Sequence, residues 1–444
     1  MFANSDGKME NKKIIVGLDI GTTKVLALVG KKNAQGNVDI LGIGKAVSEG
    51  VVRGVITNLD KTVIAIKQAI KQAEESSGID IRVVNVGIAG RHIKSSVHHG
   101  SITRERGDEE ITVADVKRLT NDMYKILLPP GSEIIHVLPQ NYMVDYEADI
   151  KDPVGMAGVR LEADFHVITA QTSAINNVHK CTKRAGLEIA ELILEPIASS
   201  LAILSEEEKE AGVCLVDIGG GTIEIAIFYD SIIRHTAVIP FGGNTITADI
   251  KTGFQVMEYQ AELLKRQFGR AIVEETNQEE IVSIPGLRNR PPKEVSVRNL
   301  AHIIEARMEE IIEMIHTEII ISGFHNKLAA GIVITGGGSQ LKSLKKLFEY
   351  ITGLDTRIGY PNELLDRNNI EEVKNPMCAT GIGLVLAGFK EVDERENACQ
   401  NAKASLKNSA KQSSKKEKQG IDLFRKILNK TKGLLIDDYE DQSN

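Results

Sequence analysis

The sequence lacks tryptophan, has few aromatic residues of any kind (4%), and contains only four cysteines in 444 residues. Cys181, Cys214, Cys378 and Cys399 are widely separated, so no pair has the CxxC spacing of a zinc site and no disulfide framework is indicated. No segment approaches the roughly 20 apolar residues of a membrane span. The N-terminal MFANSDGKMENKK also lacks the apolar core of a signal peptide. These absences predict a protein of a reducing cytosol.

The net charge of −7 is unevenly distributed along the chain. Residues 403–432 contain ten Lys or Arg against two acidic residues, which makes this segment +8 and leaves −15 for the remainder. An acidic body argues against general nucleic-acid binding, so no nucleic-acid partner is expected. The basic segment requires an explanation of its own.

Two familiar nucleotide motifs are also missing. The sequence has no GxxxxGK[ST] loop, and no GxGxxG joins an early strand to a helix. What it has instead is a repeated pattern, VGLDIGTTKVLALV at residues 16–29 and CLVDIGGGTIEIAIFYD at 214–230. In each copy an apolar strand leads an aspartate into a glycine turn, and a second strand follows. A third glycine run, GGGS, follows an apolar strand at 332–335.

The repeat predicts a duplicated α/β plan in which each half begins with a three-stranded meander. A more polar stretch, residues 90–164, interrupts the first half and is interpreted as a small inserted subdomain whose helix is opened by a capping box at Thr112 and Asp115. Periodicity predicts further strands at 38–46, 83–89, 136–146 and 165–169, and two more that end at residues 194 and 239. It predicts helices at 60–77, 173–185, 195–208, 244–251, 258–268, 299–324 and 376–387.

The chemistry of the repeated turn favours phosphate. Glycines let backbone amides approach a ligand closely, and successive amides bind oxyanions. Thr22, Thr23 and Thr222 add hydroxyl donors, and Lys24 adds a positive charge. The two aspartates would repel phosphate but suit a hydrated Mg²⁺, which binds through one or two carboxylates. A single DxGxT turn is more often an ordinary hairpin turn, so the prediction rests on the repetition.

These turns resemble the phosphate loops of the actin, DnaK and sugar-kinase superfamily. VITGGGSQL at 333–341 resembles its adenosine loop, AELLK at 261–265 its AExxK segment, and NPMCATGIGLVLAG at 375–388 its second connecting helix. The resemblance implies two actin-like (ribonuclease H-like) βββαβαβα domains around a nucleotide cleft, with an inserted α+β subdomain. It implies Mg²⁺ held through water by Asp19 and Asp217, and ATP bound by Gly21, Thr22, Thr23, Lys24, Gly219, Gly220, Gly221, Thr222, Gly242, Gly243, Asn244, Glu262, Lys265, Gly336, Gly337, Gly338 and Gln340.

Within that superfamily the sequence resembles the bacterial division family FtsA from about residue 13 to 390 and again in its tail. AGRHI, IIHVLPQNYMVDY and KDPVGMAGVRLEADFHVIT carry the resemblance, and the last is specific because it lies outside the nucleotide motifs. It implies a flexible N-terminus (1–12), a first lobe called 1A (13–89 with 165–205) and an inserted subdomain called 1C (90–164). The second lobe, 2A, comprises 206–242 with 300–390, and a small subdomain, 2B, comprises 243–299. A flexible linker (391–419), an amphipathic helix (420–436) and an acidic end (437–444) follow.

Two acidic residues leave the question of hydrolysis open. Glu224 stands where many relatives have Asp in GGGTxD, which places the carboxylate about one methylene further out. Glu195, in EPIASS, lies where DnaK-type ATPases have a Glu that orients the attacking water. The alternative is an exposed Glu that stabilises the following helix N-terminus. Binding of ATP is therefore expected, and Glu195 is only a candidate catalytic residue.

The segment GIDLFRKILNKTKGLLI at 420–436 forms an amphipathic helix on a helical wheel. A basic rim beside an apolar stripe suits an anionic membrane surface, although docking on the protein itself or on a partner is the alternative. The resemblance favours the membrane, because FtsA-like proteins end in a targeting helix; polymerisation would add avidity to a weak single anchor. The expected membrane-facing residues are Ile421, Leu423, Phe424, Ile427, Leu428, Leu434 and Leu435, with Arg425, Lys426 and Lys430 at the rim.

A basic loop, GLRNRPPKEVSVRN, contains Arg288, Arg290, Lys293 and Arg298. On composition alone it is a solvated loop; by resemblance it receives the acidic C-terminal peptide of FtsZ. The histidines show no metal-ligand spacing and are expected at the surface. The resemblance implies a peripheral protein on the cytoplasmic face of the membrane at the septum, polymerising through subdomain 1C, anchoring FtsZ and recruiting later division proteins. The alternatives are a PilM-like pilus-assembly protein and a phosphotransferase of the same fold, for which Glu195 is the sole candidate base.

Overall fold

The computed structural model describes residues 14–33, 36–105, 107–286, 291–361, 365 and 370–396. The chain forms two compact units, 1–388 and 389–444, which are considered separately. In the second unit the described residues, 389–396, are helical and include an ion pair between Arg395 and Glu391. Helical structure is therefore present past residue 390, where the flexible linker was expected to begin. The predicted amphipathic helix lies outside the described residues.

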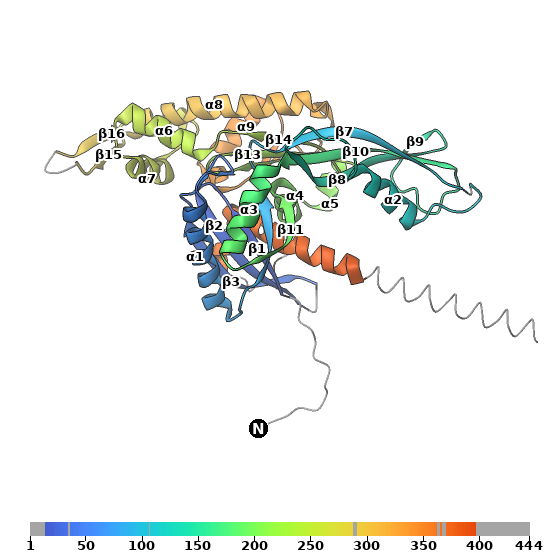
Figure 1. Cartoon of the computed structure of the whole chain (residues 1–444). Helices are drawn as coiled ribbons and strands as arrows, with labels where there is room; N and C mark the ends of the chain where they lie inside the picture. The colour runs from blue at the N-terminus through green and yellow to red at the C-terminus, as the bar shows by residue number, and fades with distance from the viewer. Residues whose placement is uncertain are drawn as a thin grey trace, which may run out of the picture. The chain divides into compact units, whose positions relative to one another are not determined.

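The first half of the chain builds a five-stranded sheet (Figure 1). Its strand order is β11-β6-β1-β2-β3, in which the first three strands along the chain form an antiparallel meander and β6 and β11 run parallel to β1. Helix α1 packs on this sheet through buried Val63, Ile66, Ile70 and Ala73, the periodic positions that predicted it. The elements are β1 (Ile14–Ile20), β2 (Lys24–Lys32), β3 (Val38–Val47), α1 (Leu59–Ser77), β6 (Val83–Ile88), α3 (Thr172–Arg184) and β11 (Glu188–Leu194).

The second half repeats the plan with the strand order β14-β13-β12-β17-β18. Again a meander carries the glycine turn between its first two strands, and the next strand joins in parallel. The predicted duplication is thus confirmed. The elements are β12 (Val213–Ile218), β13 (Ile223–Tyr229), β14 (Ile232–Ile239), α8 (Val297–Ile321), β17 (Ile332–Thr335), α9 (Leu344–Thr352) and β18 (Thr356–Ile358).

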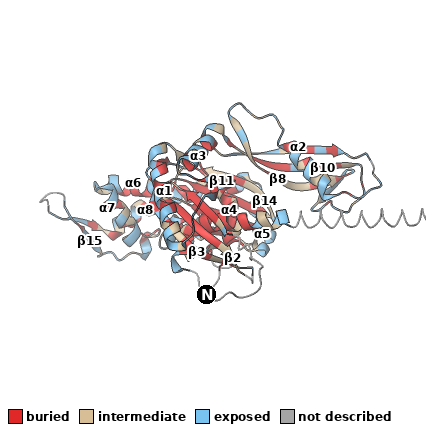
Figure 2. Ribbon diagram, turned by 60° about the horizontal axis from the view of Figure 1, so that its bottom comes forward, coloured by how far each residue is buried: buried red, intermediate tan, exposed pale blue. Residues whose placement is uncertain are grey.

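The central strands β1, β2, β12 and β13 are buried along almost their whole length (Figure 2). Their sequences are nearly continuous apolar runs because helices or other chain segments cover both faces of such a sheet. The consequence for function is that Asp19 and Asp217, at the ends of β1 and β12, are carboxylates in an apolar core. A buried carboxylate destabilises the fold unless hydrogen bonds, a cationic group or a bound metal ion offset the loss of its hydration.

The inserted stretch forms its own four-stranded sheet, β7-β10-β8-β9, with one helix and a separate apolar core. Thr112 and Asp115 make the expected capping box at α2. The sequence had predicted strands only at 136–146 and 165–169 in this region and missed β7 (KSSVHHGSIT), an edge strand of this sheet whose polar residues are mostly exposed. The elements are β7 (Lys94–Thr103), α2 (Val113–Met123), β8 (Ser132–Val144), β9 (Glu147–Ile150) and β10 (Arg160–Gln171).

The helix expected at 195–208 is two helices. Leu204 leaves the helical conformation, and Ser205 then caps the second helix through a capping box with Glu208. The remaining elements are α4 (Glu195–Ile203), α5 (Glu206–Ala211), α6 (Gly243–Phe254), α7 (Glu258–Phe268), β15 (Ile281–Ile284), β16 (Lys293–Ser296), two short strands β4 (Val51–Val52) and β5 (Val55–Ile56), and 3₁₀ turns that include η3 (Gly337–Gln340) and η5 (Pro376–Cys378). Over the described ranges, no helix combines the length and apolar content needed to cross a bilayer.

Candidate functional site

The two repeated turns have the same geometry and touch each other. The Gly21 amide donates to the Lys24 carbonyl, and the Gly219 amide donates to the Thr222 carbonyl, both at 3.0 Å. A Cβ added to Gly220 would lie 2.3 Å from Thr23 Cγ2, so this position admits only glycine while the turns are in contact. The sequence repeat therefore creates a face-to-face pair of glycine turns.

A cavity of about 660 Å³ opens beside these turns, within the size range of small-molecule and cofactor sites. Five cationic side chains line it, Lys24, Lys45, Lys265, Arg266 and Lys342, against three acidic ones. The positive excess suits a polyphosphate. Of the predicted nucleotide residues, the cavity brings together Thr23, Lys24, Gly219, Gly220, Gly242, Gly243, Asn244, Glu262, Lys265, Gly337, Gly338 and Gln340.

Helix α7 supplies an ordered polar cluster at this cavity. Lys265 Nζ lies 2.7 Å from Glu262 Oε2 and donates to the Gly243 carbonyl at 2.8 Å. Thr247 Oγ1 donates to Glu262 at 2.6 Å. Burial lowers the pKa of Lys265, and the neighbouring Glu262 opposes that shift. The cluster holds both side chains of the AExxK segment in place before any ligand binds.

The start of α6 braces the second glycine turn. The amides of Gly243 and Asn244 donate to the carbonyls of Gly219 and Gly220 at 3.0 and 2.8 Å. These two amides are engaged with the protein in this conformation. Gly242, Gly243 and Asn244 lie beside the turns as expected, and direct contact of their amides with a ligand stays a prediction.

The two aspartates differ in their surroundings. Asp217 Oδ2 accepts hydrogen bonds from Ser199 Oγ at 2.9 Å and Thr380 Oγ1 at 3.3 Å, and these two hydroxyls also contact each other. Burial raises the pKa of Asp217, and the Ser199 hydroxyl partly offsets this. Burial raises the pKa of Asp19 to about 6, against the opposing charge of Lys24. Neither Ser199, in EPIASS, nor Thr380, in NPMCATGIGLVLAG, was identified from the sequence as a partner of Asp217, because no local pattern shows which distant hydroxyl lies beside a given carboxylate.

These carboxylates fit a hydrated Mg²⁺. A bound Mg²⁺ keeps several of its waters and takes one or two carboxylates, and Asp19 and Asp217 are two buried carboxylates beside the turns. Asp19 and Asp217 would hold it, and its charge would offset theirs. Glu224, directly opposite Asp217 in the β12–β13 register, has a buried Oε1 with no hydrogen-bond partner. Burial and Asp217 raise the pKa of Glu224 to about 8.

Glu195 does not line the large cavity. It is the first residue of α4 and lines a second cavity of about 30 Å³, together with Gly21, Thr22, Thr222 and His92. Glu195 is not exposed, so that part of the alternative is wrong; its place at the start of α4 still suits either the orientation of a water or stabilisation of the helix N-terminus. Burial raises the pKa of Glu195 well above its usual value, and the nearby carboxylates add to the effect. Gly221 and Gly336 line neither of these two cavities.

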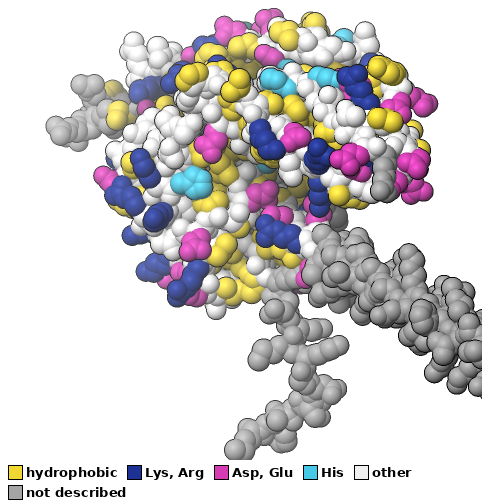
Figure 3. All heavy atoms as spheres, turned by 45° about the vertical axis from the view of Figure 1, so that its right-hand side comes forward, with side chains coloured by type: hydrophobic (Ala, Val, Ile, Leu, Met, Phe, Trp, Pro, Cys, Tyr) yellow, Lys and Arg dark blue, Asp and Glu magenta, His cyan; other side chains and the backbone are white. Residues whose placement is uncertain are grey.

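The expectation that the histidines lie at the surface is wrong for His92 and His166, whose exposed fractions are 5% and 2%. Single histidines carry no pattern that distinguishes a buried ring from an exposed one. The predicted partner-binding loop is only partly described: Lys293 is exposed on β16 and donates to the Phe254 carbonyl, and Arg298 is half-buried on α8. Arg288 and Arg290 lie outside the described residues, as do the ten predicted membrane-facing residues. On the face seen in Figure 3, side chains of both charge signs are interspersed.

Comparison with known proteins identifies the family. A family model described as "Cell division protein FtsA" matches residues 214–383, and a second, "SHS2 domain inserted in FTSA", matches residues 90–169. The cell division protein FtsA of Pseudomonas aeruginosa is 40% identical over 383 residues, which cover 86% of this chain and 91% of that protein. The chain belongs to the FtsA family. FtsA of Escherichia coli is 35% identical over 405 residues, which cover 88% of this chain and 96% of that protein.

The FtsA assignment agrees with the fold, which is actin-like with an inserted SHS2 domain. A solved PilM-PilN type IV pilus biogenesis complex contains a chain that superposes with a TM-score of 0.63 over 85% of this chain and 99% of its own length. At 16% identity that likeness is one of fold. The predicted resemblance to FtsA is confirmed, and the chain is a cell division protein of that family.

Proposed function

We propose that the chain binds ATP with Mg²⁺ between the two glycine turns and that it acts as an actin-like polymer on the cytoplasmic face of the cell membrane at the division septum. The observation that carries ATP binding is the repetition of one turn in both halves of the fold. Each turn follows a strand that ends in a buried aspartate, and both border a cavity with an excess of cationic side chains. The same proposal includes the division into the lobes 1A and 2A, the subdomains 1C and 2B, the linker and the amphipathic helix, with the bounds predicted from the sequence.

ATP would bridge the two halves of the first unit. Residues of the first turn (Thr23, Lys24) and of the second (Gly219, Gly220) line one cavity, so a triphosphate bound there contacts both. A ligand that binds across two lobes fixes the angle between them, and that angle sets the geometry of a filament. Polymer assembly gated by the nucleotide follows from this arrangement.

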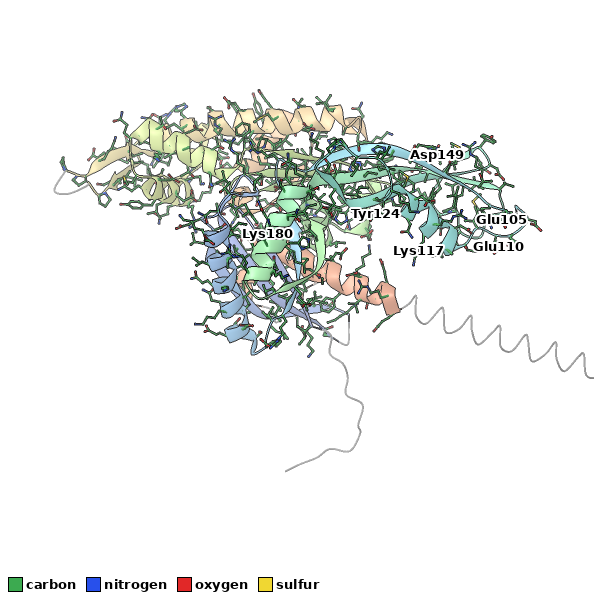
Figure 4. All side chains as sticks on the ribbon, viewed as in Figure 1. Glu105, Glu110, Lys117, Tyr124, Asp149 and Lys180 are labelled. Carbon is green, nitrogen blue, oxygen red and sulfur yellow. The ribbon has the colours of Figure 1, made fainter. Side chains whose placement is uncertain are left out.

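The inserted subdomain is the proposed surface for self-assembly and for recruitment of later division proteins. Glu105 and Glu110 lie at its far end, and Lys117 and Tyr124 lie on or next to α2, all of them exposed (Figure 4). Tyr124 is 49% exposed, and Leu127 is almost fully exposed. By this proposal a partner covers these two apolar side chains.

The basic residues around β16 are the proposed contact for the acidic C-terminal peptide of FtsZ. Reversing Lys293 and Arg298 to glutamate is expected to weaken binding of that peptide at least tenfold, because each reversal replaces attraction by repulsion. Binding of ATP should not change, since neither residue lines the large cavity. Fluorescence anisotropy with a labelled peptide checks this, with the charge-matched double reversal of Lys251 and Lys71, on α6 and α1, as the control. An unchanged peptide affinity in the double variant would place the FtsZ site elsewhere.

The predicted helix at 420–436 is the proposed membrane anchor, with FtsZ filaments tethered through it. Full-length chain should co-sediment with vesicles that contain anionic lipid, and a chain ending at Gln419 should not. Binding should rise with ATP, because assembly multiplies a weak single anchor. Neutral phosphatidylcholine vesicles are the control. If neither chain sediments, the helix docks on a protein, and a role like that of PilM moves ahead.

A further inference from the structure

The Glu195 side chain contacts residues outside the two glycine turns as well as residues of the turns. Its side chain lies over Gly87 of β6, where an added Cβ would be 3.0 Å from Glu195 Cγ and 3.2 Å from Oε1. The same side chain lines the small cavity, together with Gly21 and Thr22 of the first turn and Thr222 of the second. The residues that fix the position of this carboxylate are therefore those of β6, of the α4 N-terminus and of the small cavity.

The inserted sheet contacts the backbone beside Glu195 directly. The Leu194 amide donates to His136 Nε2 at 3.0 Å, and His136 lies on β8 of the inserted sheet. Leu194 is the N-cap of α4 and makes no side-chain cap bond, so this contact anchors the first turn of the helix that begins with Glu195. Burial lowers the pKa of His136 to about 4, which keeps the ring neutral and Nε2 able to accept.

The first residues of the insertion reach the other side of Glu195. The exposed fraction of His92 is only 5%, and neither of its ring nitrogens has a hydrogen-bond partner in the protein. Buried polar atoms in native proteins are almost always hydrogen-bonded, to water if not to protein. The small cavity that His92 shares with Glu195 is about 30 Å³, which is room for about two waters.

The root of the insertion reaches the first glycine turn through Gly54, in the hairpin of β4 and β5. The Gly54 amide donates to Thr22 Oγ1 at 3.1 Å, and a Cβ on Gly54 would lie 2.6 Å from Gly90 Cα. The segment from Gly90 to His92 therefore packs against the same hairpin that supports the turn. A movement of the inserted subdomain would therefore displace both the first glycine turn and Glu195.

We propose that the inserted subdomain positions Glu195, through the His136 contact to the Leu194 amide and through water shared by His92 and Glu195 in the small cavity. His92 and His136 are positioning residues in this arrangement, and a partner bound to the inserted subdomain can alter the action of Glu195 on a bound nucleotide. That last consequence rests on the proposed ATP function.

The first test uses the full chain without nucleotide. His136→Phe and His136→Asn both remove the acceptor at the position of Nε2 and are expected to speed hydrogen exchange of the Leu194 amide at least tenfold. His136→Gln places an amide oxygen near that position and should restore slow exchange. His166→Phe is the matched control, because His166 is a buried histidine of the same sheet that contacts Thr236 instead. Unchanged exchange in the folded acceptor-less variants would overturn the proposal.

The second test separates positioning from binding. His92→Phe and His136→Asn should lower ATP turnover at least fivefold while the Kd of a fluorescent ATP analogue changes less than twofold, and His166→Phe should leave both unchanged. A crystal structure of the nucleotide-free chain should show water within hydrogen-bond distance of both His92 and Glu195; a dry cavity overturns the His92 link. If the wild-type chain binds no ATP, the proposed function fails, while the exchange and water measurements still decide this inference.

Discussion

Replacing Gly336 by alanine is expected to lower the affinity for ATP by at least a hundredfold. Gly336 has a φ of 80°, in the region that favours glycine. An added Cβ would lie 2.2 Å from Asp217 Oδ1 and 2.6 Å from the Ile218 carbonyl oxygen. The methyl group therefore displaces the carboxylate proposed to hold Mg²⁺, or the turn itself.

The same substitution should lower the free energy of unfolding by about 2–5 kcal/mol, from backbone strain and overpacking combined. Gly337→Ala is the matched control for the unfolding free energy only, because its Cβ would meet only Met377 Cγ, at an ordinary 3.5 Å, but would enter the cavity. Gly353→Ala isolates the backbone cost alone, since Gly353 has a φ of 68° with open space around it. Titration with a fluorescent ATP analogue and urea unfolding measure both effects. A folded Gly336→Ala chain that binds ATP like wild type would remove Asp217 from the site.

The parts of this site that the sequence predicts are those encoded by a local pattern. Each glycine turn lies within one hairpin, so an apolar strand, an aspartate and glycines suffice to identify it. Their repetition then predicts two such turns facing a cleft. The cavity brings twelve of the seventeen predicted nucleotide residues together, although their contacts with a nucleotide stay a prediction.

The parts that the sequence could not predict depend on residues far apart in the chain. Asp217 is bonded by Ser199 and by Thr380, which are 18 and 163 positions away and lie in segments that look like ordinary small-residue helices. The burial of His92 depends on the hairpin at Gly54, and the contact of His136 with Leu194 joins two sheets. The edge strand β7 was missed because solvent on its exposed side permits a polar sequence that carries no alternation.

The carboxylates of the site predict a second large effect, a stability that falls with rising pH when no nucleotide is bound. An acid whose folded pKa is raised keeps its proton where the unfolded chain has lost it, so the free energy of unfolding decreases as pH rises between the two values. For Glu224 the interval runs from its usual 4.5 to about 8. His136 and His166, with pKa values lowered to about 4, act in the opposite direction, but only below about pH 6.5.

Glu224→Gln isolates this effect, because the histidines contribute equally to variant and wild type. Between pH 6 and pH 8 the wild-type chain should lose about 2 kcal/mol of unfolding free energy relative to the variant. Urea unfolding at pH 6, 7 and 8 measures the difference. Asp249→Asn, at a half-buried acid paired with Arg307 and outside both cavities, is the control and should run parallel to wild type. Equal slopes for wild type and Glu224→Gln would mean that Glu224 is already ionised in the folded chain.

The same protons link stability to ligand binding. A divalent cation held by Asp19 and Asp217 favours the ionised form of every carboxylate near it, so Mg²⁺–ATP should expel the proton of Glu224. Calorimetry at pH 7.5 in two buffers of different ionisation enthalpy should detect release of about one proton from wild type and markedly less from Glu224→Gln. An Asp in this position would be shorter and nearer the strand. If the chain binds Mg²⁺–ATP as proposed, release of this proton would make the binding depend on pH in the physiological range. Proton release that is equal in the two proteins would exclude that role of Glu224.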